Sequence, residues 1–306
     1  MLSTREAPGL FKAVIWGLSV DGEVTLSDSW QLMPFASLPD SYMKGRILER
    51  AKEIADKAAW LSHTHFNTPQ VVLVREAPRF PYISTDGAAY TQISKFEGEA
   101  RDYCTFVEAT LIGHPLAVGC FFEYTDQELD LQNWQNTITW LLPEIHPYVS
   151  TSTVKSGQAI RDDLSKYFSL PSEMRSDLLR SMSRFTLSQC RHSMVDRILD
   201  LTLAFEIAVS GGGEMAPPSW KVSVRAAQLI GGTLPARQSN RSKINELYKL
   251  RNRATHGGTL KHADALKQWN LVNECTAIFQ ALMQSFLLLG SKPDWNKLEL
   301  EPRADT

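Results

Sequence analysis

The first 155 residues alternate between short apolar runs and longer segments with helical spacing. Three runs rich in β-branched and aromatic residues are typical of strands: FKAVIWGLSV at 11–20, PQVVLVRE at 69–76 and HPLAVGCFFEYT at 114–125. Residues 41–63 carry apolar side chains at helical spacing, and 128–142 reads as a helix that stops at Pro143. We therefore expect a mixed α/β or α+β domain over residues 1–155.

From Ser172 onward the pattern is helical and the strand-like runs disappear. Glycine and proline pairs interrupt it at short intervals, as expected for helices joined by tight turns in a bundle. The expected helices lie near 173–189, 193–209, 218–230, 237–256 and 262–289. The fold class is then α+β, with an N-terminal mixed α/β domain at 1–155, an all-α bundle at 156–291 and a polar C-terminal tail at 292–306.

Charge divides unevenly between the two halves of the chain. Residues 1–155 hold 12 Lys and Arg against 19 Asp and Glu, whereas residues 156–306 hold 20 against 15. Within 221–262 there are nine basic residues and a single acid, Glu246. A basic stretch in an otherwise acidic chain favours a polyanionic partner such as nucleic acid, although solvated helices carry such runs too.

Other classes of protein find little support in the sequence. The four cysteines are scattered, which indicates neither a disulfide framework nor a zinc site. The N-terminus lacks the pattern of a secretory signal, and the apolar run at 277–290 is too short to cross a bilayer. We expect a soluble cytoplasmic protein with no membrane partner, no cofactor and no metal.

The segment LYKLRNRATHGG at 247–258 carries the most suggestive chemistry. Arg251 and His256 are five residues apart, or roughly 140° around an ideal helix, so they do not share a face. Asn252 and His256 are four apart and do share one. The glycines Gly257 and Gly258 offer a left-handed stop, which places His256 in the last turn of the helix.

Three ordered blocks give the chain a family resemblance: SRFTLSQCRHSMVDRILDLTLAFEIAV, WKVSVRAAQLIGG and INELYKLRNRATHGG. Together they resemble the Apea-like branch of the HEPN superfamily over roughly residues 183–260. The matching positions are Asp200, Ala204, Glu206, Arg225, Ala226, Leu247, Tyr248, Arg251, Asn252, His256 and Gly257. The chain departs from the family at Thr255, where a valine is common.

The resemblance implies a metal-independent endoribonuclease that works as a homodimer. Such cleavage needs a base for the 2′-OH, an acid for the leaving oxygen and a cation on the phosphorane, and two copies of the motif would supply them. The implied catalytic residues are Arg251, Asn252 and His256. Supporting roles fall to Glu206 and Arg225, and contacts with RNA fall to the remaining motif positions Arg253, Lys249 and Tyr248.

Glu206 can be placed from the sequence without the family. The run ILDLTLAFEIAV is apolar on nearly every face, so its helix should be central and its one interior acid largely buried. An unpaired buried carboxylate is costly. We therefore expect Glu206 to meet an arginine, with Arg251 and Arg225 as the candidates.

Several other features favour structural roles. The histidines His63, His65, His114 and His146 have no carboxylate or cysteine at ligand spacing, which argues against a metal site. The triple glycine at 211–213 reads as a linker. The aromatics on helical runs are expected in the core rather than as base-stacking platforms: Trp134, Trp140, Trp220 and Trp269.

Three hypotheses of function follow. The first is an RNA-cutting toxin or antiphage-defence effector that acts on RNA such as tRNA. Its N-terminal domain would sense a protein or phage-derived trigger or select the RNA. The second is a non-catalytic module of the same family that binds nucleotide, RNA or a partner protein. The third is an interaction scaffold with a degenerate motif.

Overall fold

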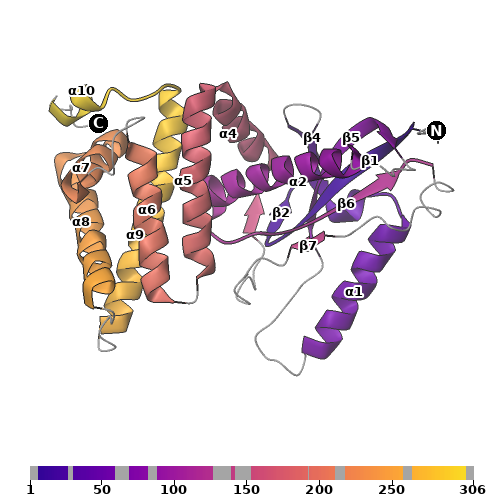
Figure 1. Cartoon of the computed structure of the whole chain (residues 1–306), viewed down its shortest axis with the longest axis horizontal. Coiled ribbons are helices and arrows are strands. Elements are labelled where there is room, and N and C mark those ends of the chain that lie inside the picture. Colours follow the sequence, from indigo (N-terminus) through magenta and orange to yellow (C-terminus); the bar gives the residue numbers. More distant parts are fainter. Residues whose placement is uncertain are drawn as a thin grey trace. The chain divides into compact units, whose positions relative to one another are not determined.

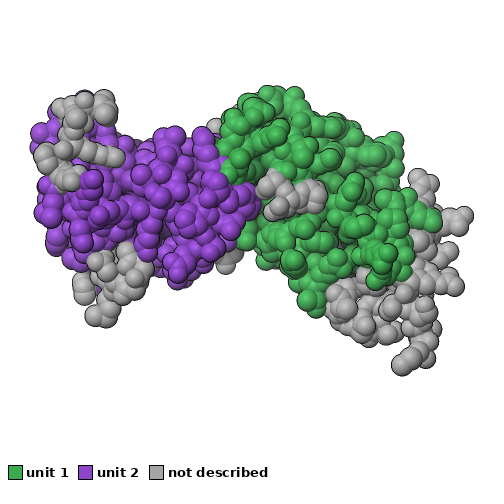
Figure 2. Space-filling model, turned by 90° about the horizontal axis from the view of Figure 1, so that it is seen from above, with its two compact units in different colours: residues 1–104, 115–165 green, residues 105–114, 166–306 purple. Residues whose placement is uncertain are grey.

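The chain forms two compact units, seen here in a computed structural model (Figures 1 and 2). Unit 1 comprises residues 1–104 and 115–165, and unit 2 comprises residues 105–114 and 166–306. The described residues are 6–26, 30–58, 69–81, 88–126, 139–141, 153–191, 193–210, 218–257 and 264–300.

Unit 1 is built on a sheet in which every hydrogen-bonded neighbour is antiparallel. Its strand order is β3-β4-β5-β1-β6-β7. The long strand β1 lies in the middle, and its Val14 faces Val72 of β5 on one side and Gly119 of β6 on the other. The strands are β1 (Glu6–Trp16), β3 (Val24–Thr25), β4 (Trp30–Pro34), β5 (Val71–Pro81), β6 (Ala117–Tyr124) and β7 (Thr139–Leu141). A separate parallel pair joins β2 (Leu18–Val20) to β8 (Thr153–Lys155).

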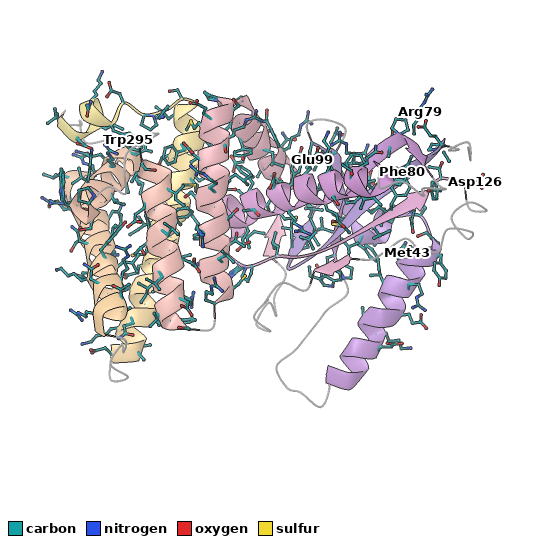
Figure 3. The ribbon with its side chains drawn as sticks, in the orientation of Figure 1. Met43, Arg79, Phe80, Glu99, Asp126 and Trp295 are labelled. Carbon is teal, nitrogen blue, oxygen red and sulfur yellow. The ribbon has the colours of Figure 1, made fainter. Side chains whose placement is uncertain are left out.

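The two faces of this sheet are covered by different helices. Since successive side chains of a strand point to opposite faces, Phe11 and Val14 of β1 belong to different cores. The Val14 face packs against the 3₁₀ turn η2 (Phe35–Ser37) and, through residues such as Met43, the start of α1 (Tyr42–Ala58) (Figure 3). On the Phe11 face, Phe96 of α2 (Ala88–Val107) lies 5.4 Å from the Phe11 ring. The alternation of apolar residues along β1 is explained by these two cores.

Each face of the sheet also holds an ion pair. On the Val14 face, the buried Lys12 ammonium binds the Glu123 carboxylate, which also accepts a 2.6 Å hydrogen bond from the Ser41 hydroxyl. On the Phe11 face, Arg75 binds Glu99 of α2, and the Arg75 guanidinium lies 4.9 Å from the Phe96 ring. The first pair joins β1 to β6, and the second joins β5 to α2. Both therefore hold neighbouring elements of unit 1 together.

The described residues of unit 2 form helices joined by short connections, with no strand among them. The π-helical turn η3 (Glu108–Ile112) belongs to it and contacts α5 and α9. The core contains a ring cluster in which Phe279 stacks on Phe185 at 4.7 Å and meets Phe205 edge-on at 5.3 Å. The helices are α4 (Gly157–Ser169), which starts in unit 1, α5 (Ser172–Cys190), α6 (Met194–Val209), α7 (Ser219–Ile230), α8 (Leu234–Gly257), α9 (Ala265–Leu289) and α10 (Trp295–Leu300).

The arrangement of the long helices places several chain turns together. The α5–α6 connection lies at the same end of the bundle at which α8 ends and α9 begins (Figure 1). The predicted motif at 247–258 lies at this end, because α8 continues without interruption to Gly257. This end of unit 2 is called the motif end below.

The α+β fold class is confirmed, and the five long helices of the second half lie close to their predicted ranges. The sequence reading missed α2, α4 and the strand β4. It was wrong at 139–141, where the expected helix 128–142 contains the strand β7; residues 128–138 and 142 lie outside the described part. The sequence placed a single boundary at 155, whereas the last boundary between the compact units follows residue 165 and residues 105–114 also belong to unit 2.

The expected polar tail at 292–306 is also wrong over residues 295–300, which form α10. Trp295 is buried, and Glu299 pairs at 2.6 Å with Arg225 of α7, which is itself 2% exposed. The Arg225 guanidinium also lies 5.2 Å from the Trp295 ring and donates to the Val209 carbonyl at the end of α6. A segment that looks polar therefore belongs to the bundle, because its acid neutralises a buried cation.

Candidate functional site

The site begins with the way α8 lies in the bundle. Leu247, Tyr248 and Ala254 are buried, whereas Lys249, Asn252 and Arg253 are exposed. Since these positions follow the helical period, one stripe of α8 packs inward and the other presents polar side chains to solvent. The motif therefore occupies a packed helix with an exposed polar and basic side.

Glu206 and Arg251 are brought together as predicted. Glu206 is 8% exposed on the apolar helix α6, and its Oε1 lies 3.7 Å from Nη1 of Arg251. The Arg251 side chain is 38% exposed, so the pair joins a buried acid to a cation that reaches solvent. Burying a carboxylate requires such compensation. Glu206 thereby restrains Arg251 at Nη1, while the guanidinium group remains partly exposed to solvent.

Tyr248 completes this cluster from inside. Its ring is 3% exposed, and its hydroxyl lies 3.5 Å from the Thr202 carbonyl. Burial raises the pKa of Tyr248, and the charge of Glu206 and a hydrogen bond with it raise the pKa further. The Arg251 guanidinium carbon lies 6.0 Å from the ring centre. The prediction that Tyr248 contacts RNA is wrong, because the side chain is buried; Tyr248 braces Glu206 and Arg251 instead.

Residue 256 lies in the last turn of α8, and the His256 side chain is outside the described part. Since α8 is continuous, position 256 is roughly 140° around the helix from Arg251 and roughly 40° from Asn252. The hydroxyl of Thr255, the position at which the sequence departs from the resemblance, lies 3.1 Å from the carbonyls of Arg251 and Asn252. Thr255 is thus accommodated by bonding back to its own helix.

A groove of about 360 Å³ runs between α8 and α9 at the motif end. Two of the predicted RNA contacts, Lys249 and Arg253, line it from α8, and Lys267 faces them from α9. Two acids, Glu246 and Asp264, line it as well, so the groove has mixed charge with a basic excess. The sequence analysis did not identify Lys267 as a groove residue. The pattern that could have revealed it is helical spacing, because the groove is lined from this side by Asp264, Lys267, Gln268 and Leu271.

Arg225 lies in a different part of the bundle. Its carboxylate partner is Glu299 of α10, while Glu206 pairs with Arg251. Of the two arginines predicted as partners of Glu206, the structure therefore selects Arg251, and Arg225 holds α6, α7 and α10 together.

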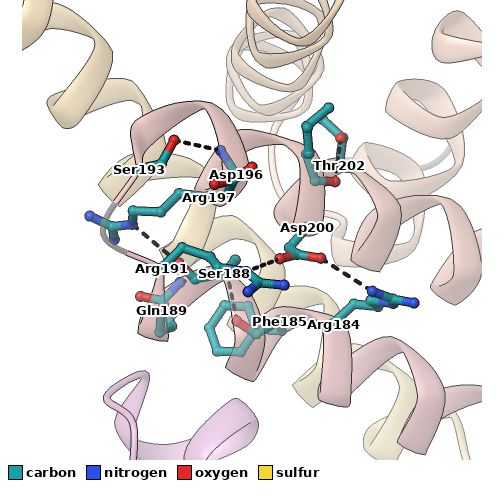
Figure 4. Close-up of polar contacts among 11 residues, drawn as sticks. Arg184, Phe185, Ser188, Gln189, Arg191, Ser193, Asp196, Arg197, Asp200 and Thr202 are labelled. Atoms are coloured by element: carbon teal, nitrogen blue, oxygen red, sulfur yellow. Dashed lines mark hydrogen bonds and ion pairs between the residues drawn. The ribbon is translucent and has the colours of Figure 1, made fainter. Parts of the chain in front are cut away.

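Asp200 of α6 forms ion pairs with two arginines and lies in a second group of charged residues (Figure 4). Its Oδ2 accepts a 2.9 Å hydrogen bond from Arg191, and its Oδ1 lies 3.4 Å from Arg184. Nearby, the buried Arg197 donates to the Ser188 carbonyl near the C-terminus of α5. Carbonyls at a helix C-terminus lack helical partners and attract cations, so Arg197 closes the end of α5.

The tryptophan predictions are wrong for two residues. Trp220 on α7 is 54% exposed and Trp269 on α9 is 46% exposed, so neither is a core side chain. Trp134 lies outside the described residues, and Trp140 falls on β7 with its side chain outside them.

Metal ligands are not gathered anywhere in the part of the chain that the structure describes, where no group of three or more His, Cys, Asp or Glu side chains could hold an ion. His114 is exposed, and His63, His65 and His146 lie outside the described residues, as do the glycines 211–213. By length and composition alone, α9 is the one described helix that could cross a membrane; its Phe279 and Phe286 are buried in unit 2.

Comparison with known proteins adds no relative: no family model, no curated protein and no solved structure matches the chain.

Proposed function

We propose that the chain is a metal-independent endoribonuclease of the HEPN type that acts as a homodimer. The observation that carries the proposal is the Glu206–Arg251 pair, in which a buried acid holds a partly exposed arginine one helical turn and a half before position 256. A restrained guanidinium suits a phosphate, because its forked donors stay charged and aligned without a metal.

The chemistry assigns a role to each exposed motif residue. Arg251 binds the scissile phosphate and steadies the charge of the phosphorane, and Asn252 orients the phosphate or the imidazole. One His256 removes the proton from the 2′-OH, and the His256 of a second copy protonates the leaving 5′-oxygen. The 2′-oxygen attacks phosphorus as the P–O5′ bond breaks, which leaves a 2′,3′-cyclic phosphate and a free 5′-hydroxyl.

The biological setting is part of the same proposal. RNA, including tRNA, is the substrate, and the protein acts in the cytoplasm as a toxin or antiphage effector without a cofactor. The acidic unit 1 would select the RNA or respond to a protein or phage-derived trigger. The alternative is a non-catalytic module, which the groove between α8 and α9 favours because Lys249, Arg253 and Lys267 can bind an anion without cleaving it.

Glu206→Gln is expected to lower the turnover of RNA about 10- to 100-fold, because the uncharged amide no longer holds Arg251 against the phosphate. The effect should fall on kcat, with KM little changed, since the groove that binds RNA keeps its charges. Steady-state cleavage of a fluorescent RNA measures both constants. The matched control is Glu299→Gln, which should lower the melting temperature and leave kcat unchanged; an equal loss of kcat in both variants would reduce Glu206 to a stabilising residue.

The proposal as a whole is tested by the ends of the products. Purified protein incubated with tRNA in EDTA is expected to produce fragments ending in 2′,3′-cyclic phosphate and 5′-hydroxyl. Cleavage that requires a divalent metal and leaves 5′-phosphates would contradict it. Stable binding of RNA that stays intact, both without a trigger and in the presence of phage lysate, would favour the non-catalytic module.

A further inference from the structure

The exposed Trp269 lies directly on a buried cation. Its indole ring is 4.6 Å from the guanidinium carbon of Arg197, which is only 7% exposed. Arg197 cannot move freely, because its Nε donates to the Ser188 carbonyl at 3.2 Å. The ring is therefore held in place by a fixed cation while nearly half of its surface remains in solvent.

Two further arginines share one carboxylate on α6, the helix that also carries Arg197 (Figure 4). Asp200 is engaged through Oδ1 by Arg184 and through Oδ2 by Arg191, whose side chains remain 44% and 34% exposed. With Arg197, three cations lie in this group, against the two carboxylates of Asp200 and Asp196, the latter in the first turn of α6. This excess of positive charge around partly exposed guanidinium groups would be offset by a bound phosphate.

The position of this cluster matters for the proposed function. Arg191 follows the last residue of α5, Arg197 lies in the first turn of α6, and Trp269 lies near the start of α9. All three are at the motif end, where α8 ends with the catalytic segment (Figure 1). A chain of RNA whose scissile phosphate lies at Arg251 would have further nucleotides to place on this end of the bundle.

The combination of residue types indicates a single strand rather than a duplex. An aromatic ring offers a stacking surface only to a base whose own face is free, and bases inside a duplex already stack on each other. Guanidinium groups beside the ring meet the phosphates that flank such a base. Neither feature requires a particular base sequence.

We propose that Trp269, Arg197, Arg184 and Arg191 form a binding site for single-stranded RNA, separate from the Glu206–Arg251 cluster. One base stacks on Trp269, and phosphates further along the same strand contact Arg184 and Arg191. The site deepens the proposed function, on which it rests, by naming an unpaired RNA segment as the substrate and by anchoring it outside the catalytic segment.

The test uses the full-length protein and a short fluorescent 2′-O-methyl RNA, which cannot be cleaved because it lacks the attacking 2′-OH. Trp269→Leu is expected to weaken binding about tenfold, whereas Trp269→Phe, which keeps a ring, should keep most of the affinity. Arg184→Gln should weaken binding less and reduce its dependence on salt. The control is Trp220→Leu, which removes a tryptophan of similar exposure from α7 and should leave binding unchanged.

The outcomes separate this site from the ribonuclease. Unchanged binding by folded Trp269→Leu, checked by its melting temperature, would overturn the site even if the wild type cleaves RNA. Tenfold weaker binding by that variant supports the site even if no cleavage is found. Equal affinity for a duplex of the same sequence, or displacement by an acidic peptide that depends on Trp269 in the same way, would overturn the assignment to single-stranded RNA.

Discussion

His256→Ala is expected to reduce RNA cleavage about a thousandfold, the largest single effect that the proposed mechanism predicts. General acid–base catalysis contributes about 100- to 10,000-fold per group. In a homodimer the substitution removes both the base and the acid, so little activity should survive. The measurement is the initial rate of tRNA cleavage in EDTA with purified protein, alongside the toxicity of the variant on expression in cells.

The matched control for this experiment is His114→Ala. His114 is an exposed histidine in the same compact unit, and its removal should leave both cleavage and toxicity unchanged. Persistence of cleavage in His256→Ala at more than a tenth of the wild-type rate would mean that another group performs the proton transfers.

Phe279→Ala is expected to destabilise unit 2 by about 3–5 kcal/mol, the cost typical of removing a buried phenylalanine from a core. Phe279 has no exposed surface, and it joins α5 and α6 through Phe185 and Phe205. Its loss opens a cavity that rigid helices fill only in part. Urea denaturation followed by circular dichroism measures the change in the free energy of unfolding.

Leu288→Ala provides the comparison on the same helix. Leu288 is 75% exposed, so this substitution should change the free energy of unfolding by less than about 0.5 kcal/mol. A similar loss in both variants would show that α9 is stabilised by its exposed side and not by the ring cluster.

The parts of the fold that the sequence predicted are those in which local pattern and tertiary burial agree. The helices from 173 to 289 carry the 3.6-residue period of a bundle, and the runs at 71–74 and 118–122 are β-branched or aromatic enough to indicate strands. The helix α10 could not be found in this way. Its polar sequence WNKLEL is held by Arg225, a partner 74 residues away, and no local pattern reveals that contact.

The predictions for the site succeeded or failed for the same physical reason. Glu206 was placed correctly because the cost of burying a carboxylate demands a cation, whatever the topology. The burial of Tyr248 was not predicted, because the packing of α8 against α6 decides whether its side chain faces solvent or α6. Trp269 was wrongly expected in the core for a related reason. The sequence of α9 is apolar on most of its faces, so the spacing of its apolar residues does not distinguish a core tryptophan from an exposed one that packs on Arg197.

The most direct test of the account is whether two copies bring their 256 positions together. All four native cysteines are buried, so they give little background against the thiol that His256→Cys introduces. A short bismaleimide is expected to join two His256→Cys chains into a covalent dimer. Leu288→Cys, on an exposed position of α9, should form no covalent dimer under the same conditions. Absence of the 256–256 cross-link at concentrations at which the wild type cleaves RNA would contradict a composite two-histidine site.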